Sequence, residues 1–298
     1  MNGIIDLHTH TNISDGTMTP MELMDEAIKT GLKIIALTDH DTVSGIDMAL
    51  SHPKVSEYIP IFNGGDGFGN LKDPDTYSNP ALKLIPGIEI STTWKEKDIH
   101  ILGFYINRKD PDLLKSLETI QKRRSERNRK MIALMNADGI PLKEEDIPCS
   151  LSCVTRAHFA WFLTKLGISK DREDAFKHYI GNGCKYYLAK VPTSPVEAIE
   201  IIKAAGGIPF MAHPMIAKLS DKELDELVGI LSEHGLKGLE AYHSSHNHSD
   251  VRKALALAEK YGLDISTGSD YHADNKPDVF LGMGRGNICC NELPSILM

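Results

Sequence analysis

Seven short apolar runs separated by helical patterns constrain the fold of this chain more than any other feature. The runs are Ile4–Leu7, Lys33–Leu37, Lys83–Ile90, Ile99–Tyr105, Ile208–Ala212, Gly238–Tyr242 and Asp264–Thr267. Strands that alternate with helices predict a parallel sheet, and this number of strands favours a barrel over an open sheet. The sequence therefore predicts an α/β protein built on a seven-stranded barrel.

Imidazole and carboxylate side chains stand at or just after the ends of most of these runs. They are His8, His10, Asp39, His40, Glu89, His213, Asp270 and His272. His100 is the exception, because it stands at the start of the fourth run. Barrel enzymes build their sites from the carboxyl ends of the strands, whereas a doubly wound sheet would not gather so many strands at one point.

The pair His8 and His10 predicts a metal site at the end of the first strand. Strand side chains alternate with a period of two, so the two imidazoles project to the same side. Asp15 and His40 follow soon after, and imidazole and carboxylate are the groups that hold first-row divalent metals. A single histidine would more simply be structural, but a pair followed by two further ligand types indicates metal binding.

Helix signals separate the barrel strands. Thr19-Pro20 and Ser194-Pro195 each combine a capping hydroxyl with proline at the first helical position. Further helices are predicted for Asp221–His234 and Asp250–Tyr261, and His248 is expected near the start of the latter.

Two segments break the alternation of strands and helices. Residues 52–82 are rich in glycine and proline and are predicted to be a long loop. Residues 107–185 are predicted to form a small helical insertion that caps the barrel mouth, between barrel segments 1–106 and 186–298. Its helices are expected at Pro111–Asn136, Arg156–Leu166 and Asp171–Ile180.

Composition limits the class of protein. The chain has 298 residues, 41% hydrophobic content and a net charge of −8, which disfavours a grip on long nucleic acid. The net charge does not exclude an anionic small substrate, because bound cations would reverse the sign of the charge locally. The five cysteines fit no zinc-finger spacing. No apolar run is long enough for a membrane span and no signal peptide is evident, so a cytoplasmic protein is expected.

Further motifs extend the first cluster along the chain. They are Pro86-Gly87-Ile88-Glu89-Ile90-Ser91, His100-Ile-Leu-Gly103, Thr155-Arg156-Ala157-His158, Ala212-His213-Pro214 and Gly268-Ser-Asp270-Tyr-His272. In this order, over nearly the whole chain, they resemble the polymerase-and-histidinol-phosphatase (PHP) family of metal-dependent phosphoesterases. The resemblance implies a distorted seven-stranded barrel. It is strongest to the trinuclear branch with a helical insertion, which acts on 3′,5′-bisphosphate nucleotides, short RNA ends and cyclic phosphate esters.

The resemblance also implies a ligand set for three divalent metal ions. The first ion would take His8, His10, Glu89 and Asp270; the second Glu89, His100 and His213; and the third Asp15, His40 and His272. Neighbouring divalent ions lower the pKa of a bridging water and clamp phosphoryl oxygens, so a metal-bridging hydroxide is expected to attack phosphorus. Mn²⁺, Fe²⁺ and Zn²⁺ all suit these ligands.

Fewer residues are expected to contact the substrate than to bind metal. Arg156 is predicted to clamp phosphate, since a guanidinium meets phosphate in a bidentate fork; the family usually has proline where this chain has Ala157. Lys185 stands where the family often has a lysine, with an ordinary surface lysine as the alternative. His243 and His246 follow the sixth run, and either is a candidate to protonate the leaving group or hold substrate.

Three alternatives remain for the function. The first is a histidinol-phosphate phosphatase, as in another branch of the family, although the helical insertion argues against it. The second is a non-catalytic, metal-stabilised regulatory domain, for which loss of ligands would be the signature. The third is a hydrolase of C–N bonds, since amidohydrolases also begin with His-x-His. Glu89 at a strand end favours phosphoester chemistry.

Overall fold

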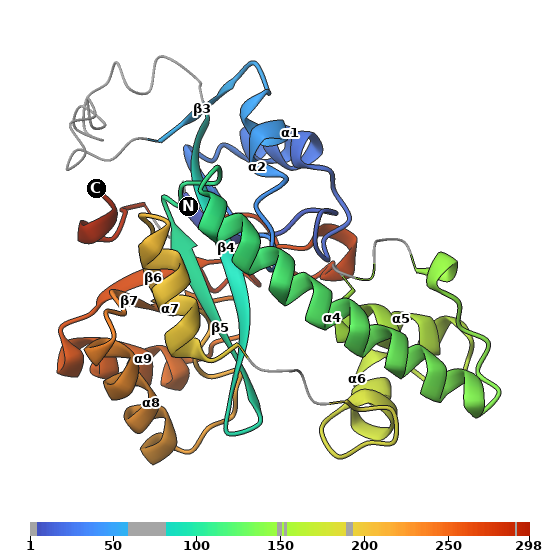
Figure 1. Ribbon diagram of the computed structural model, residues 1–298. Helices are drawn as coiled ribbons and strands as arrows, with labels where there is room; N and C mark the ends of the chain where they lie inside the picture. Colours follow the sequence, from blue (N-terminus) through green and yellow to red (C-terminus); the bar gives the residue numbers. More distant parts are fainter. Residues whose placement is uncertain (1–4, 59–81, 148–150, 152–153, 189–192, 290) are drawn as a thin grey trace. The chain divides into compact units, whose positions relative to one another are not determined.

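The structure is a computed structural model that describes residues 5–58, 82–147, 151, 154–188, 193–289 and 291–298 (Figure 1). The chain forms two compact units. One comprises Met1–Leu114 and Thr193–Met298, and the other Lys115–Pro192, whereas the sequence predicts an insertion at 107–185. The placement of the insertion over the barrel mouth stays a prediction.

A nearly closed, barrel-like sheet forms the larger unit, as the sequence predicts. Its strands, in spatial order, are β1 (Ile5–Thr9), β2 (Ile34–Leu37), β4 (Leu82–Trp94), β5 (Lys97–Phe104), β6 (Ile208–Met211), β7 (Gly238–His243) and β8 (Asp264–Gly268). The first and last strands meet where the Asp270 amide donates to the His8 carbonyl at 2.8 Å and the His10 amide to the Tyr271 carbonyl at 3.0 Å. These bonds place the first motif, at His8 and His10, beside the last motif, at Asp270 and Tyr271.

The prediction of an all-parallel sheet is wrong at β5, which runs antiparallel to both β4 and β6. Strand β4 does not end at Ile90; it continues to Trp94 and turns directly into β5, and the two long strands lie side by side in Figure 1. A reversed strand presents its beginning at the edge where its neighbours end. This explains why His100, near the start of β5, lies with residues from the ends of other strands.

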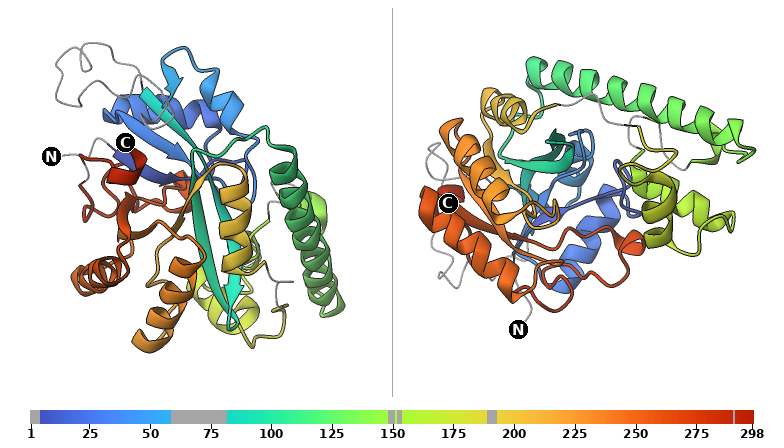
Figure 2. Two further views of the ribbon diagram at one scale, coloured as in Figure 1. Left: turned by 60° about the vertical axis from the view of Figure 1, so that its left-hand side comes forward. Right: turned by 90° about the horizontal axis from the view of Figure 1, so that it is seen from below.

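The helices of this unit are α1 (Pro20–Thr30), α2 (Ile46–Leu50), α7 (Pro195–Ala204), α8 (Asp221–Glu233) and α9 (His248–Tyr261). In the view from below in Figure 2, α7 to α9 (gold to orange) lie outside the strands. Thr19, Ser194, Ser220 and Asn247 each complete a capping box with an acidic residue three positions later. The last helix starts at His248, two residues before the predicted start, because Asn247 caps it. Across the described residues, no helix has the length and apolar character needed to cross a membrane.

The predicted loop at 52–82 contains a short strand, β3 (Val55–Glu57), which pairs parallel with β4. Residues 59–81, including the glycine-rich run that motivated the prediction, lie outside the described residues. Leu7, Ile34, Phe104 and Phe210, which lie on β1, β2, β5 and β6, are fully buried in one apolar cluster. This cluster packs together strands that carry the polar residues.

The smaller unit is helical, as expected. It contains most of α4 (Pro111–Ala137), together with η2 (Glu144–Asp146), α5 (Arg156–Lys165), α6 (Arg172–Ala175) and η3 (Phe176–Ile180). The helix predicted over Asp171–Ile180 is instead one α-turn followed by a π-helical turn. The smaller unit has an apolar cluster of its own, which includes Met131, Met135, Phe159 and Leu163. The side-chain amide of the buried Asn128 donates to the carbonyls of Leu151 and Val154, both at 2.9 Å.

The close approach of β8 to β1 generates a stability prediction at Gly268. An added Cβ there would lie 2.2 Å from the Cβ of His8 and 2.9 Å from its amide nitrogen, so we expect Gly268→Ala to cost about 3 kcal/mol. Gly31 has φ +86° and nothing within 4 Å, so Gly31→Ala should cost only backbone strain, about 1–2 kcal/mol. Urea unfolding followed by circular dichroism compares the two variants, and equal losses would contradict the steric account.

Candidate metal centre

Glu89 on β4 is the centre of the candidate site. Its side chain is fully buried, and five imidazole nitrogens surround its two oxygens. Oε1 lies 2.8 Å from His100 Nδ1 and 3.1 Å from His213 Nε2. Oε2 lies 2.9 Å from His40 Nδ1 and 3.3 Å from the Nε2 atoms of His8 and His10. One carboxylate thus stands between five imidazoles from four separate segments of the chain.

Asp270 faces the other side of the first histidine pair. Its Oδ1 lies 3.3 Å from His10 Nε2 and 3.6 Å from His8 Nε2. The backbone of Asp270 has φ +57°, a conformation that costs a non-glycine residue free energy and is common at functional sites. The amide hydrogen bond from Asp270 to the carbonyl of His8 holds it there.

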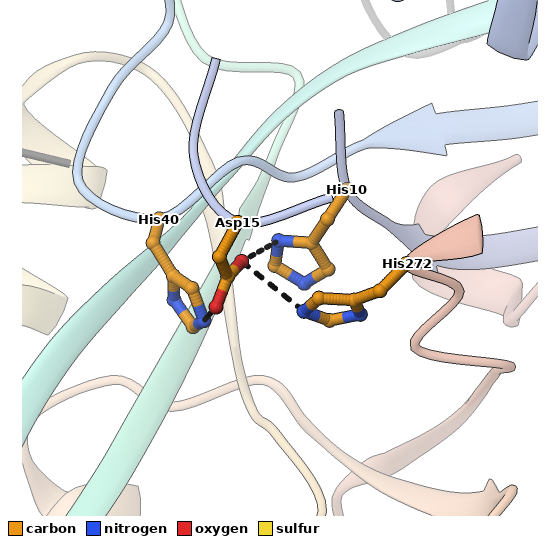
Figure 3. A group of neighbouring side chains, drawn as sticks. All are labelled: His10, Asp15, His40 and His272. Carbon is orange, nitrogen blue, oxygen red and sulfur yellow. Dashed lines mark ion pairs between the residues drawn. The ribbon is translucent and has the colours of Figure 1, made fainter. Parts of the chain in front are cut away.

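A further group joins Asp15 with His10, His40 and His272 (Figure 3). Asp15 Oδ1 lies 3.1 Å from His272 Nε2 and 3.8 Å from His10 Nδ1, and Oδ2 lies 3.7 Å from His40 Nε2. His10 therefore stands between two groups, with one ring nitrogen toward Asp15 and the other toward Asp270 and Glu89. The resemblance assigned His10 to the first metal alone, and the structure places it beside the third set as well.

Asp39 positions the loop that carries Asp15. It accepts hydrogen bonds from the Thr11 amide at 2.8 Å, the Thr11 hydroxyl at 2.6 Å and the Ser14 hydroxyl at 2.6 Å. Because both of its carboxylate oxygens accept hydrogen bonds from this loop, Asp39 holds the loop in position. The sequence placed it at a strand end with the ligand types, but its contacts are structural.

The geometry gathers all nine predicted metal ligands at one end of the barrel. Among the described residues, four sets of three or four of them have ligand atoms within 4.8 Å of one another. His8 Nε2, His10 Nε2 and Glu89 Oε2 are buried and make no hydrogen bond to any described residue. Buried polar atoms without partners are costly, so inward-facing lone pairs of this kind fit divalent cations.

The charge state of the protein without metal follows from this crowding. Burial opposes ionisation of Glu89, but the neighbouring imidazoles outweigh it and hold the pKa of this carboxyl well below its usual value. The pKa of Asp15 is lowered in the same way, and the pKa of Asp270 is lowered by the Lys276 ammonium together with His272 and His8, which outweigh burial. Burial likewise opposes protonation of His10, but Asp270 and Glu89 raise its pKa to about 9. The pKa of His8 is raised well above normal by Glu240, Glu89 and Asp270 despite burial.

Sequence reasoning missed two charged residues of the site. Glu240 lies fully buried on β7 with Oε1 2.9 Å from His8 Nδ1. Lys276 places Nζ 2.5 Å from Asp270 Oδ2. A carboxylate inside the apolar run Gly238–Tyr242 was a signal, since charged residues are almost never fully buried without a partner. No comparable signal marked Lys276.

His243 and His246, the candidate acids, differ in their surroundings. His243 Nδ1 accepts from the Ser245 amide at 3.0 Å, so the proton of the neutral ring is on Nε2, 3.2 Å from Asp270 Oδ2. Burial lowers the pKa of His243 to about 4. This arrangement suits orienting Asp270 better than donating a proton to substrate. His246 Nδ1 donates to the Ala241 carbonyl at 2.9 Å, and its role stays a prediction.

Arg156 and Lys185 lie in the smaller unit. The Arg156 guanidinium stands 5.6 Å from the ring centres of both Phe176 and Tyr187. Lys185 is exposed and pairs with Asp138, with Nζ 2.5 Å from Oδ2. This surface ion pair matches the ordinary-lysine alternative. The roles of both residues toward substrate stay predictions.

A barrel that gathers buried histidines and carboxylates at one end is typical of metal-dependent enzymes. The comparisons with known proteins make the class specific. A family model for the PHP domain matches residues 6–274, and the chain belongs to the PHP family. It is a metal-dependent phosphoesterase, an enzyme that hydrolyses phosphate esters.

Several known proteins are similar over nearly their whole length. The 5′-3′ exoribonuclease Rnm of Escherichia coli is 32% identical over 95% of this chain and 88% of its own. A 3′,5′-nucleoside bisphosphate phosphatase of Chromobacterium violaceum is 31% identical over 90% of this chain and 87% of its own. A solved structure from Chromobacterium violaceum, described as an amidohydrolase with bound sulfate and no metal, superposes with a TM-score of 0.78. It is 28% identical and covers 99% of this chain and 93% of its own.

The raised pKa values of His8 and His10 generate a prediction for metal binding. Imidazoles must be deprotonated to bind a metal, so at pH 7 we expect binding to release about two protons per chain and to strengthen as the pH rises toward 9. Titration calorimetry with Zn²⁺ in buffers of different ionisation enthalpy measures this release. His178→Gln, which changes an exposed histidine paired with Asp174, should leave it unaltered. A binding enthalpy independent of the buffer would contradict the charge assignment.

Proposed function

We propose that this phosphoesterase uses a centre of three divalent ions to hydrolyse a phosphate ester of a small nucleotide. A nucleoside 3′,5′-bisphosphate, the end of a short RNA or a cyclic phosphate ester is the expected substrate. The observation that carries the proposal is the fully buried Glu89 carboxylate, surrounded by five imidazole nitrogens at 2.8–3.3 Å.

We propose three ions because the ligand atoms can be divided into two sets around Glu89 and one around Asp15. Glu89 Oε2 faces His8 and His10, and Glu89 Oε1 faces His100 and His213, so one carboxylate has an oxygen for each of two ions. Asp15, His40 and His272, together with His10, form a third set that contains neither Glu89 nor Asp270, although His40 Nδ1 also lies 2.9 Å from Glu89 Oε2. Histidine with carboxylate accepts Mn²⁺, Fe²⁺ or Zn²⁺.

Charge explains why such a centre would attract phosphate inside an acidic protein. Three divalent ions bring six positive charges, which the three carboxylates Asp15, Glu89 and Asp270 offset by only about half. When bound, the ions would activate water and neutralise phosphoryl oxygens. The protein's own part is to fix the ligand positions, since Glu89, His8 and His10 are almost completely buried and have little freedom to move.

The proposed substrate class is based on the named proteins that are similar to this chain. Two proteins at 31–32% identity are described as an exoribonuclease and a nucleoside bisphosphate phosphatase, and both descriptions name hydrolysis of a nucleotide phosphate ester. Histidinol phosphate is the second candidate within the same chemistry. A non-catalytic role is disfavoured, because each of the nine expected ligand positions carries a suitable side chain.

The central prediction concerns Glu89. We expect Glu89→Ala to abolish phosphate release and to loosen at least two metals, because it removes the oxygens shared by the first two sets. Elemental analysis, combined with phosphate release from a 3′,5′-bisphosphate nucleotide, a cyclic phosphate, a 5′-phosphorylated short RNA and histidinol phosphate, measures both effects.

Glu226→Ala is the matched control, because Glu226 is an exposed carboxylate paired with Lys95. It should keep full activity and metal content. Fewer than two metals per wild-type chain would overturn the three-ion centre, and full activity in Glu89→Ala would overturn the bridging role.

A second prediction tests the phosphate clamp. A charge-assisted hydrogen-bond pair contributes about 1.5–3 kcal/mol, so Arg156→Ala should lower kcat/KM by about 10–100-fold while metal content stays unchanged. Arg129→Ala removes an exposed arginine paired with Glu144 and should have no effect. Equal kinetics for the two variants would show that Arg156 does not contact substrate.

A further inference from the structure

Glu240 connects two of the candidate metal ligands without facing the centre itself. It lies within β7, and its side chain is fully buried. Oε1 lies 2.9 Å from His8 Nδ1, and Oε2 accepts the backbone amide of His213 at 2.8 Å. His8 and His213 belong, together with Glu89, to one set of neighbouring ligand atoms.

Both partners of Glu240 must be donors. A backbone amide always donates, so Oε2 can only accept from His213. His8 Nε2 points toward Glu89 and Asp270, and it can present a lone pair to a metal only if the ring proton is on Nδ1. A carboxylate offers an acceptor to each partner, whereas the amide of a glutamine would set its NH₂ group against one of them.

The backbone at these positions agrees with such a constraint. His213 has φ +26°, which a non-glycine residue adopts only when its surroundings fix it. The hydrogen bond from its amide to Glu240 is such a restraint. A Cβ on Gly268 would lie 2.6 Å from Glu240 Oε1, the oxygen that contacts His8. Glycine at this position therefore leaves room for the contact between Glu240 and His8.

We infer that Glu240 is a positioning residue, which sets the ring tautomer of His8 and the backbone of His213 together and thereby couples the first two metal positions. This inference rests on the proposed three-ion centre. Carboxylates that orient metal-binding histidines change metal affinity by about 10–100-fold when they are removed. Because Glu240 serves two ligands, its loss should weaken both positions, while Asp15, His40 and His272 keep the third.

The test is Glu240→Gln, compared with wild type and with Glu226→Gln, in which an exposed carboxylate is changed in the same way. Mn²⁺ retained after dialysis against graded chelator concentrations gives affinity and stoichiometry, and thermal unfolding is recorded with and without Mn²⁺. We expect Glu240→Gln to lose two ions at a chelator concentration 10–100-fold lower than wild type, and to show a smaller rise in Tm on adding Mn²⁺. Glu226→Gln should match wild type in both measurements.

The outcomes separate the inference from the proposed function. If wild type binds fewer than two ions, the proposed function fails. If wild type binds three ions and Glu240→Gln binds them equally well, the inference fails. A Tm lowered equally with and without Mn²⁺ would assign Glu240 a structural role only, and would also overturn the inference.

A second variant keeps the inference testable if Glu240→Gln does not fold. Glu240→Asp retains both acceptor oxygens and the charge, but its side chain is one methylene shorter and cannot reach both donors. We expect a metal affinity between those of wild type and Glu240→Gln. An unchanged Mn²⁺ affinity in folded Glu240→Asp would overturn the coupling of His8 and His213.

Discussion

The interaction on which the rest of the structure depends is the burial of one carboxylate, Glu89, among five imidazoles from four segments of the chain. An ionised group is taken out of water only where compensating charges and hydrogen bonds are fixed around it. Strand order, the reversed direction of β5 and the closure of β8 onto β1 all serve this arrangement, since each brings one or more partners to Glu89 or Asp270. The barrel can therefore be described as a support that holds charged groups in a geometry they would not adopt alone.

Much of the candidate site could be predicted from local sequence. Candidate metal ligands of fixed chemical type stand at strand ends, and short-range patterns such as His8-x-His10 and Ser-Asp270-Tyr-His272 predict them. Helix starts were equally accessible, because capping boxes such as the one formed by Ser194 and Glu197 are determined within four residues. The α/β barrel followed from counting strands, and the structure agrees with it.

Other features depend on contacts that are distant in sequence. The direction of β5 is set by a tight turn after Trp94, and nothing in an apolar run records which way it will pair. Glu240 is a single carboxylate within an apolar run, and its contact is with His8, more than two hundred residues away. Lys276 is an ordinary lysine by sequence and is distinguished only by its contact with Asp270. Pairings of this kind are decided by tertiary packing, which local patterns do not encode.

The junction between β1 and β8 has a consequence for the order in which this protein is assembled. Asp270 is synthesised more than 250 residues after His8, yet its amide bonds to the carbonyl of His8. Contacts of such long sequence separation form late in folding, because the entropy of closing the chain must be overcome first. During synthesis His8 and His10 therefore emerge well before the carboxylate of Asp270. The candidate ligand set that contains all three residues can be assembled only after residue 270 has been added to the chain.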